Sequence, residues 1–279
     1  MTLAAHHYGK SRIRVMKVIR EGAIHTIKEL SVDVMLGGSF ESSYTAGDNT
    51  LVVPTDTMKN TVNVLAHQHL GRETERFALL LIDHFLGKYP QVETVEVQVS
   101  ERLWDRLTID ETPHPHSFTS AQQMRPFTTA SATRTSKVLR SGVSDLLILK
   151  STGSGFSGFP RDELTTLPET DDRIFATQMM ATWTWSAAPT DYANSNREIV
   201  AALLKPFALR YSPSVQTTLY QMGEAALTRC SEIREIELSM PNKHCLLVDL
   251  QPFGLVNANI LFVPVEEPHG QINATVVRN

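Results

Sequence analysis

The sequence is poor in cysteine, in long apolar runs and in charge of one sign. Its two cysteines, Cys230 and Cys245, cannot build a disulfide framework or a thiolate metal cage. We expect both to be ordinary buried thiols. The 26 Lys and Arg residues are scattered and nearly balance the 30 Asp and Glu residues. This pattern argues against nucleic acid as the main partner.

Membrane and export signals are also missing. The longest uninterrupted apolar runs, such as Phe77–Ile82, are far shorter than the roughly 18–20 residues that span a bilayer. The N-terminal segment Thr2–Lys10 is short and mostly polar, unlike a secretory signal. We therefore expect an intracellular protein with no membrane partner.

No dinucleotide fingerprint, P-loop, zincin helix or calcium loop occurs, so an enzyme with this sequence is expected to work without a nucleotide cofactor. The pair His114 and His116 could point one way on an extended chain. No Cys, Asp or Glu ligand lies near them at the usual spacing. We favour a structural role for both histidines and expect no metal site.

The residues that are present, with 42% hydrophobic and 20% charged content, suit a globular protein with a sizeable core. Apolar residues alternate or recur at helical spacing along the first half. We expect Gly22 to join the first two strands, and Gly87 with Pro90 to end the second helix. The elements expected here are strands at Arg12–Val15 and Leu30–Leu36, helices from Pro54–Asp56 and over Thr74–Leu86, and a strand at Val95–Val99.

The second half repeats this order of elements. Expected are strands over Val138–Lys150 and Ala181–Trp185, a helix near Arg197–Phe207, a helix from about Ser214, and strands at Ile233–Leu238, His244–Leu250 and Ala258–Val263. The order strand-strand-helix-helix-strand-strand, twice, indicates an α+β protein with antiparallel sheets and helices on one face. We expect two domains, 1–136 and 137–279. Because each sheet leaves open edges, association with another copy is expected.

One loop gathers an aromatic ring and several charges. The apolar run Leu146–Leu149 leads into the small residues Ser151–Gly155, and Phe156, Leu167 and Arg173 follow. Small residues allow the backbone to approach a ligand closely, and the phenyl ring offers a flat apolar face. The loop therefore suits a planar, polar, anionic ring.

Other candidate residues favour plain structural roles when each is taken alone. Lys10 would be a solvated lysine beside a glycine, and Thr55 with Asp56 would be a helix cap. Gln216 would be a polar residue in the first turn of a helix. His244 would be a half-buried imidazole after a turn formed by Pro241–His244.

Together, eight segments resemble, in order, the signatures of the urate oxidase (uricase) family. The resemblance runs from Tyr8 to about Pro264. The segments are Tyr8–Ser11, Pro54–Thr61, Pro113–Phe118, Leu149–Thr152, Gly158–Phe159 with Arg161–Glu163, Thr165–Leu167, Ser214–Gln216 and Pro241–His244. Eight matches at compatible spacing make chance improbable.

The resemblance implies tandem T-fold domains in a homotetramer whose paired chains close their sheets into a barrel. It implies active sites at the interface, with Lys10 and Thr55 from one subunit and the remaining residues from the other. The implied reaction is oxidation of urate by O2 and water to 5-hydroxyisourate and hydrogen peroxide, without metal or flavin. The Ser-Lys-Leu peroxisomal address is absent after Val276, so we expect a cytoplasmic protein.

Substrate-binding roles follow from the same resemblance. Phe156 would stack on the purine, and Arg173 would make paired charge-assisted bonds to it. Gln216 would hold the opposite edge, and Leu167 would wall the pocket. The backbone N–H groups of Val215 and Asp56 would donate from two helix N-termini.

Catalytic roles are also implied. Lys10 would be the general base, acting through Thr55. Asn242 and Thr55 would hold O2 and then water over the purine face. His244 would extend the proton relay to Lys10.

Two alternatives remain open from the sequence. One is another T-fold enzyme acting on a purine or pterin; such enzymes usually carry a Cys/His zinc site, and no such cluster is evident. The other is a non-catalytic purine-binding member. The presence of Lys10, Thr55 and His244 speaks against it, since a retired site has no need of a relay.

Overall fold

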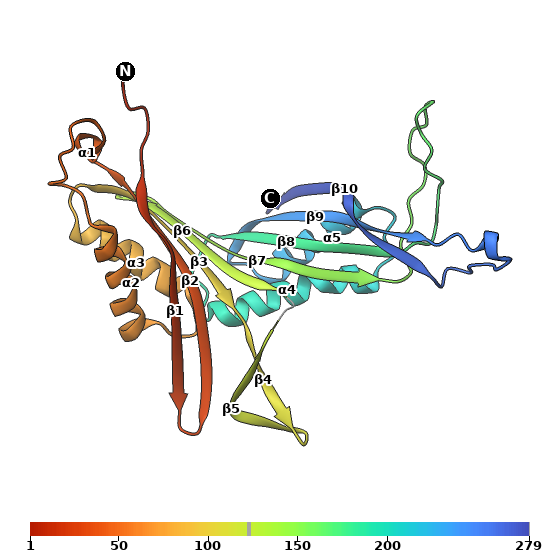
Figure 1. The fold of residues 1–279 in the computed structure, drawn as a ribbon, viewed down its shortest axis with the longest axis horizontal. Coiled ribbons are helices and arrows are strands. Elements are labelled where there is room, and N and C mark those ends of the chain that lie inside the picture. Colours follow the sequence, from red (N-terminus) through yellow and green to blue (C-terminus); the bar gives the residue numbers. More distant parts are fainter. Residues whose placement is uncertain (122–123, 279) are drawn as a thin grey trace. The chain divides into compact units, whose positions relative to one another are not determined.

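The chain folds as two compact units, seen in a computed structural model that describes residues 1–121 and 124–278. The first unit comprises Met1–Val143 with Ala187–Asn194, and the second comprises Ser144–Ser186 with Ser195–Asn279. Asn279, at the end of the C-terminal tripeptide, lies outside the described residues. Figure 1 gives the element labels.

The first unit is built on antiparallel strands in the order β1-β2-β3-β6, with a separate hairpin of β4 and β5. Strand β7 begins in this unit and ends in the other. The bounds are β1 Tyr8–Glu21, β2 Ile24–Gly38, α1 Glu41–Thr45, α2 Thr55–His69, α3 Thr74–Lys88, β3 Val92–Arg102, β4 Trp104–Ile109, β5 Thr112–Ser120, β6 Arg125–Thr133 and β7 Lys137–Lys150.

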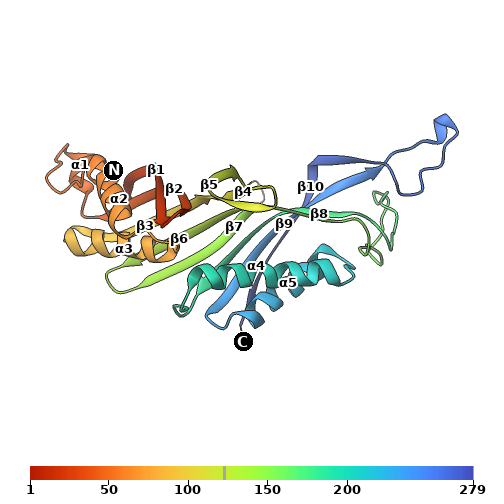
Figure 2. The same cartoon turned by 90° about the horizontal axis from the view of Figure 1, so that it is seen from below.

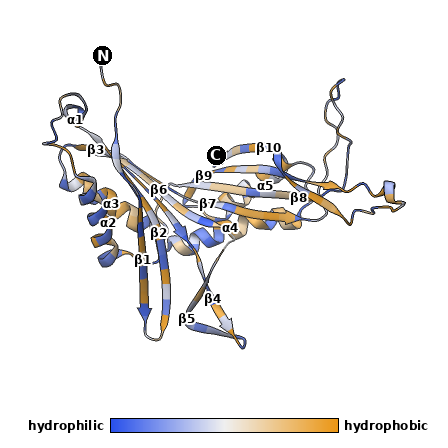
Figure 3. Ribbon diagram, viewed as in Figure 1, coloured by the Kyte–Doolittle hydropathy of each residue, from blue (hydrophilic) through white to orange (hydrophobic). Residues whose placement is uncertain are grey.

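The alternating sequence of β2 explains why helices cover only one face of this sheet. Val32 and Val34 are fully buried, whereas the intervening Asp33 is half-buried, because successive side chains point to opposite faces. Bands of hydrophilic and hydrophobic residues alternate along β1 and β2 (Figure 3). Helices α2 and α3 lie along the strands of this unit (Figure 2), and they bury Met58 and Phe77.

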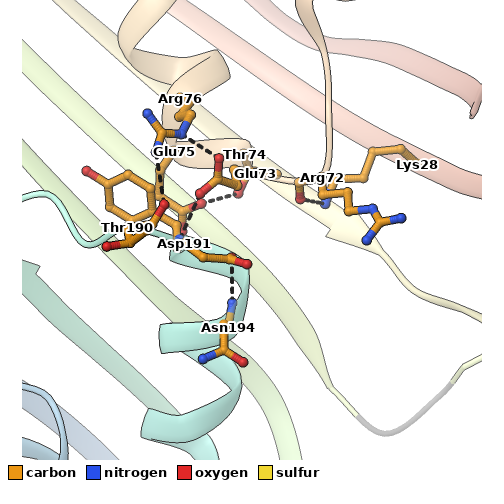
Figure 4. Close-up of polar contacts among 10 residues, drawn as sticks. Lys28, Arg72, Glu73, Thr74, Glu75, Arg76, Thr190, Asp191 and Asn194 are labelled. Atoms are coloured by element: carbon orange, nitrogen blue, oxygen red, sulfur yellow. Dashed lines mark hydrogen bonds and ion pairs between the residues drawn. The ribbon is translucent and has the colours of Figure 1, made fainter.

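Residues 187–194 pack on the N-terminus of α3 and so belong to the first unit (Figure 4). The Glu73 carboxylate accepts from the Tyr192 N–H at 2.7 Å and pairs with Arg76 at 2.5 Å. Arg76 also donates to the Thr190 carbonyl at 3.3 Å, and its guanidinium lies 5.7 Å from the Tyr192 ring centre. These contacts anchor the segment that leads into α4.

The second unit has strands in the order β7-β8-β9-β10. Its core contains Trp183, Met222 and Leu238, which are buried between β8, β9 and α5. The bounds are β8 Phe175–Trp185, α4 Tyr192–Leu209, α5 Val215–Arg229, β9 Ile233–Leu247, the 3-10 helix η1 Gln251–Phe253 and β10 Phe262–Val277.

The predicted α+β class and the doubled strand-strand-helix-helix-strand-strand order are confirmed. Helix α1 and the β4–β5 hairpin are additions that the periodicity did not predict. The expected domain division, 1–136 and 137–279, stays a proposal; the boundary between the compact units falls inside β7, between Val143 and Ser144. Within the described residues, no helix has the length and apolarity to cross a membrane.

Several local predictions were wrong. Gly87 lies inside α3, which continues to Lys88. The predicted turn at Pro241–His244 does not exist, because β9 runs through it as one strand. Pairing with β8 keeps the same register on both sides of Met240 and Pro241 and skips these two residues; Pro241 has no N–H to donate.

The C-terminal prediction also failed, since β10 starts at Phe262 and extends to Val277 instead of spanning Ala258–Val263. Both cysteines are free thiols. Cys230 is buried as expected, but Cys245 is only half-buried.

Candidate active site

Lys10 lies on β1 opposite Val34 of β2, beside the start of α2. The Tyr8 hydroxyl accepts from the Val53 N–H at 2.7 Å and donates to the Val53 carbonyl at 3.1 Å. This pair of bonds ties the beginning of β1 to the segment that enters α2. Thr55 is the first residue of that helix, so Lys10 and Thr55 are held at the same end of the first unit.

The start of α2 is not capped by a side chain. Pro54 occupies the N-cap position without a side-chain bond to the helix, so the interpretation of Thr55 and Asp56 as a cap is wrong. The Asp56 carboxylate instead accepts from Lys59 at 2.5 Å and from Asn60 at 2.9 Å. The first N–H groups of the helix therefore have no intrahelical acceptor and point outward as donors.

The electrostatic surroundings of Asp56 also indicate where Lys10 lies. The hydrogen bond from Lys59, followed by the charge of Lys59, lowers the pKa of the Asp56 carboxyl, and the charge of Lys10 lowers that pKa further. Lys10 is thus within electrostatic range of the first turn of α2. Because Asp56 directly follows Thr55 in the chain, it belongs with Lys10 and Thr55 and not with the remaining site residues.

In the second unit, backbone hydrogen bonds fix the loop that carries Phe156. Phe156 exchanges N–H···O bonds of 2.7 and 3.0 Å with Thr170, and the Arg173 N–H donates to the Ser154 carbonyl at 2.8 Å. The Gly155 N–H donates to the Ser212 carbonyl at 2.8 Å. Segments distant in the sequence are thereby joined, just ahead of α5.

Gly155 is required for this close approach. A Cβ at Gly155 would come within 2.2 Å of the Tyr211 hydroxyl and 2.8 Å of the Thr170 carbonyl oxygen. The Tyr211 hydroxyl donates to the Asp171 carbonyl at 2.8 Å. A side chain at Gly155 would therefore push these segments apart.

Arg173 and Phe156, predicted separately, lie together. The Arg173 guanidinium carbon is 5.5 Å from the centre of the Phe156 ring, within the range of a cation–π contact. Burial lowers the pKa of Arg173. The buried Nε has no hydrogen-bond partner within the described part of the chain. Since a buried donor without a partner is costly, this atom is suited to an anionic acceptor beside the ring.

Helix α5 begins next to this loop. Ser214 caps it, since its hydroxyl accepts from the Thr217 N–H at 3.1 Å; the predicted helix from about Ser214 is confirmed. Val215 and Gln216 form the first turn, with Val215 buried and Gln216 exposed. Their N–H groups are among those that no helix carbonyl can satisfy.

Asn242 and His244 lie on one face of β9. They continue the row of Leu238 and Met240, both fully buried, because alternate residues share a face. Asn242 pairs with Thr177 of β8. Strand β8 begins at Phe175, just after Arg173, so the start of β8 brings Arg173 toward this part of β9.

Leu167 is exposed in the single chain, and its predicted role as a pocket wall stays a prediction. Its side chain is 52% exposed, and its carbonyl accepts from Arg161 at 3.2 Å. Phe159 was not predicted as a site residue, yet its ring stacks on Phe156 at 4.9 Å between centres. The only sequence signal was its place in the Gly158–Phe159 segment.

The buried Thr177 hydroxyl was also missed. It has no partner among the residues that the structure describes, and it faces the Asn242 position across the ladder. A lone threonine in an apolar strand carries no distinguishing sequence pattern, so only the pairing shows it.

The two histidines set aside as metal ligands lie on β5. Their rings meet edge to face at 4.6 Å, and the carbonyl of His114 accepts from Arg106 at 2.7 Å. Across residues 1–121 and 124–278, no group of three or more His, Cys, Asp or Glu side chains is placed to hold a metal ion.

A cavity of about 720 Å³ in the second unit lies away from the predicted site residues. It runs between α4 and α5, is lined by residues such as Lys205 and Arg229, and includes none of the predicted site residues. Lys10, Thr55 and Asp56 therefore form one set in the first unit, and Phe156 and the others form a second set in the second unit.

Comparison with known proteins gives the family. The uricase family profile matches residues 6–131 and 139–273. The uricase of Arthrobacter globiformis is 40% identical over 278 residues, covering 100% of this chain and 90% of that protein. The uricase of Dictyostelium discoideum is 38% identical over 281 residues, covering 100% and 98%.

Solved structures agree in fold. The crystal structure of uricase from Arthrobacter globiformis matches with a TM-score of 0.95 at 40% identity, covering 100% of this chain and 95% of that one. Urate oxidase from Bacillus sp. TB-90 shares the fold at only 20% identity, with a TM-score of 0.85 and coverage of 98% and 100%. Since profile, relatives and tandem T-fold all agree over nearly the whole length, the chain belongs to the uricase family.

Proposed function

We propose that the protein oxidises urate with O2 and water to 5-hydroxyisourate and hydrogen peroxide, without a metal or flavin. The observation that carries the proposal is the full-length family match at 40% identity. The Arg173–Phe156 pair supports it, because a half-buried cation whose buried Nε lacks a partner in the described part of the chain, beside an aromatic face, suits a flat anion. Family membership argues against the pterin-enzyme alternative.

In the proposed complex, urate stacks on Phe156 and Arg173 donates to one edge of the purine. Gln216 donates to the opposite edge, and the N–H groups of Val215 and Asp56 add donors from the starts of α5 and α2. Leu167 closes the pocket wall. Donors fixed by backbone geometry favour urate over analogues that lack the matching acceptors.

Urate itself supplies the two electrons in this reaction. Lys10, acting through Thr55, removes a proton from urate, which makes the ring rich enough in electrons to reduce O2 to peroxide. Asn242 and Thr55 hold O2 and then water over the ring, and the water oxygen becomes the new hydroxyl. Reduction of O2 by two electrons needs two protons: one comes from urate through Lys10, the other comes from the water that adds to the ring, and His244 extends the relay that carries them, so that peroxide leaves as H2O2.

We also propose a homotetramer in which Lys10, Thr55 and Asp56 of one subunit meet the remaining residues of another. Co-expression of two variants tests this sharing. Lys10→Ala and Arg173→Ala chains, each impaired alone, should regain activity in mixed tetramers, because an interface between the two variants contains one intact site. No recovery in verified mixed tetramers would contradict shared sites.

The reaction is tested by following urate's ultraviolet absorbance together with hydrogen peroxide. We expect one peroxide for each urate, unchanged by a chelator after metal removal. No oxidation would favour the non-catalytic, purine-binding alternative. Activity that disappears with the chelator would refute the metal-free part of the proposal.

A further inference from the structure

Strand β1 contains one extra residue directly after Lys10. Lys10 pairs with Val34 and Ile13 pairs with Val32, so Ser11 and Arg12 together oppose a single residue of β2. Arg12 has φ 57°, the left-handed conformation that non-glycine residues rarely adopt. This geometry is a β-bulge.

The bulge decides which face of the sheet Lys10 occupies. Residues directly opposite in an antiparallel pair share a face, so Lys10 lies on the face of the fully buried Val34 and Val32. That is the helix-covered face: further along it, Lys17 donates to the Ala66 carbonyl of α2 at 3.0 Å. Lys10 thus faces the side on which α2 presents Thr55.

Without the bulge, the segment before Arg12 would shift by one residue along β2. Lys10 would then lie opposite Met35 and not opposite Val34. Met35 belongs to the half-buried row on the other face of β2, and a one-residue shift turns every side chain to the opposite face. Lys10 would point away from Thr55.

Asp33 is the β2 residue that the bulge opposes, and it holds the bulge in place. Its Oδ1 accepts from the Arg12 N–H at 2.5 Å. Arg12 is exposed, so its own packing contributes little to this conformation. Asp33 lies between Val32 and Val34 on the opposite face from Lys10, and it acts on Lys10 only through the backbone.

We propose that Asp33 is a positioning residue for Lys10: by accepting from the Arg12 N–H it maintains the bulge that turns Lys10 toward Thr55. The inference rests on the proposed urate oxidation, in which Lys10 is the base. If urate oxidation is not the function, the wild-type protein will not oxidise urate. If only this inference is wrong, the wild-type protein will be active, and the kcat values of the variants described next will differ from those expected.

The test compares Asp33→Ala with Asp33→Ala/Arg12→Gly in the full-length protein. Because general-base catalysis typically contributes about 10²–10⁴-fold, partial loss of base positioning should lower kcat about tenfold or more in Asp33→Ala. KM should stay within about twofold, since no proposed urate contact changes. Glycine adopts positive φ without strain, so Arg12→Gly should restore at least half of the lost kcat on a logarithmic scale.

Ser31→Ala is the matched control, since Ser31 lies on the same half-buried row of β2 and pairs with Arg14 beyond the bulge. Its kcat should match the wild type.

Should Asp33→Ala fail to fold, Asp33→Asn replaces it; the amide oxygen is a weaker acceptor, and Arg12→Gly must again raise kcat. Wild-type kcat in Asp33→Ala, or no rescue by Arg12→Gly, would overturn the proposal.

Discussion

Arg173→Ala should weaken urate binding far more than it slows turnover. The guanidinium is half-buried beside Phe156, and its Nε lacks a partner within the residues described. In the proposed complex it donates to the urate anion, and a hydrogen bond to a charged group contributes roughly 1.5–3 kcal/mol. Loss of one such bond raises Kd by about 10- to 150-fold, and loss of both should exceed this range.

Urate can be titrated without turnover if O2 is excluded, which separates Kd from kcat. Arg161→Ala is the control, because Arg161 is exposed, lies 5.3 Å from the Phe159 ring centre and donates to the Leu167 carbonyl. Its anaerobic Kd should stay within about twofold, as expected for surface substitutions. An unchanged Kd in Arg173→Ala, with reduced kcat, would refute the assignment of Arg173 to binding.

Three further predictions follow from the structure. Lys10→Ala and Thr55→Ala should each lower kcat by roughly 10²–10⁴-fold; unchanged urate consumption in both would refute the assignment of the base. Gly155→Ala should raise the KM for urate and lower the melting temperature, because its Cβ would lie 2.2 Å from a tyrosine hydroxyl; wild-type values for both would contradict the close approach. Lys28→Met should lower the free energy of unfolding by about 3–5 kcal/mol near neutral pH, because it leaves buried Glu101 without its ion-pair partner at 2.7 Å. Burial raises the pKa of Glu101 and Lys28 lowers it; removal of Lys28 should raise that pKa further, so denaturant melts should show the loss shrinking as pH falls from the variant's folded-state pKa to the wild-type one.

Periodicity predicted most elements because one face of each sheet is buried. It failed at the C-terminus for a physical reason. Most residues of β10 are exposed along Phe262–Val277, so the strand lacks the buried row that produces alternation. Pro241 misled the prediction in the opposite sense: a proline usually ends a strand, but here the ladder to β8 simply skips it.

The site residues could be named by resemblance, but their arrangement depends on contacts that leave no local pattern. Arg173 reaches Phe156 because Ser154, Gly155 and Phe156 form backbone bonds to residues 14 or more positions away. The alternation of polar and apolar residues over Arg12–Val15 predicted a strand and gave no sign of a bulge. The bulge at Arg12 became visible only from the pairing with β2.

The repeated fold provides the same support in both units, and the side chains give each its own chemistry. Each unit places a helix N-terminus beside the end of a sheet, and such a terminus attracts an anion whatever its sequence. Beside the start of α2 lies Lys10, which can exchange a proton. Beside the start of α5 lies the loop with Phe156 and Arg173, whose paired side chains can hold a flat anionic ring. In the proposed tetramer, the first unit of one chain would supply Lys10 and Thr55, and the second unit of another would supply the ring-holding loop together with His244, so that neither chain alone would complete a site.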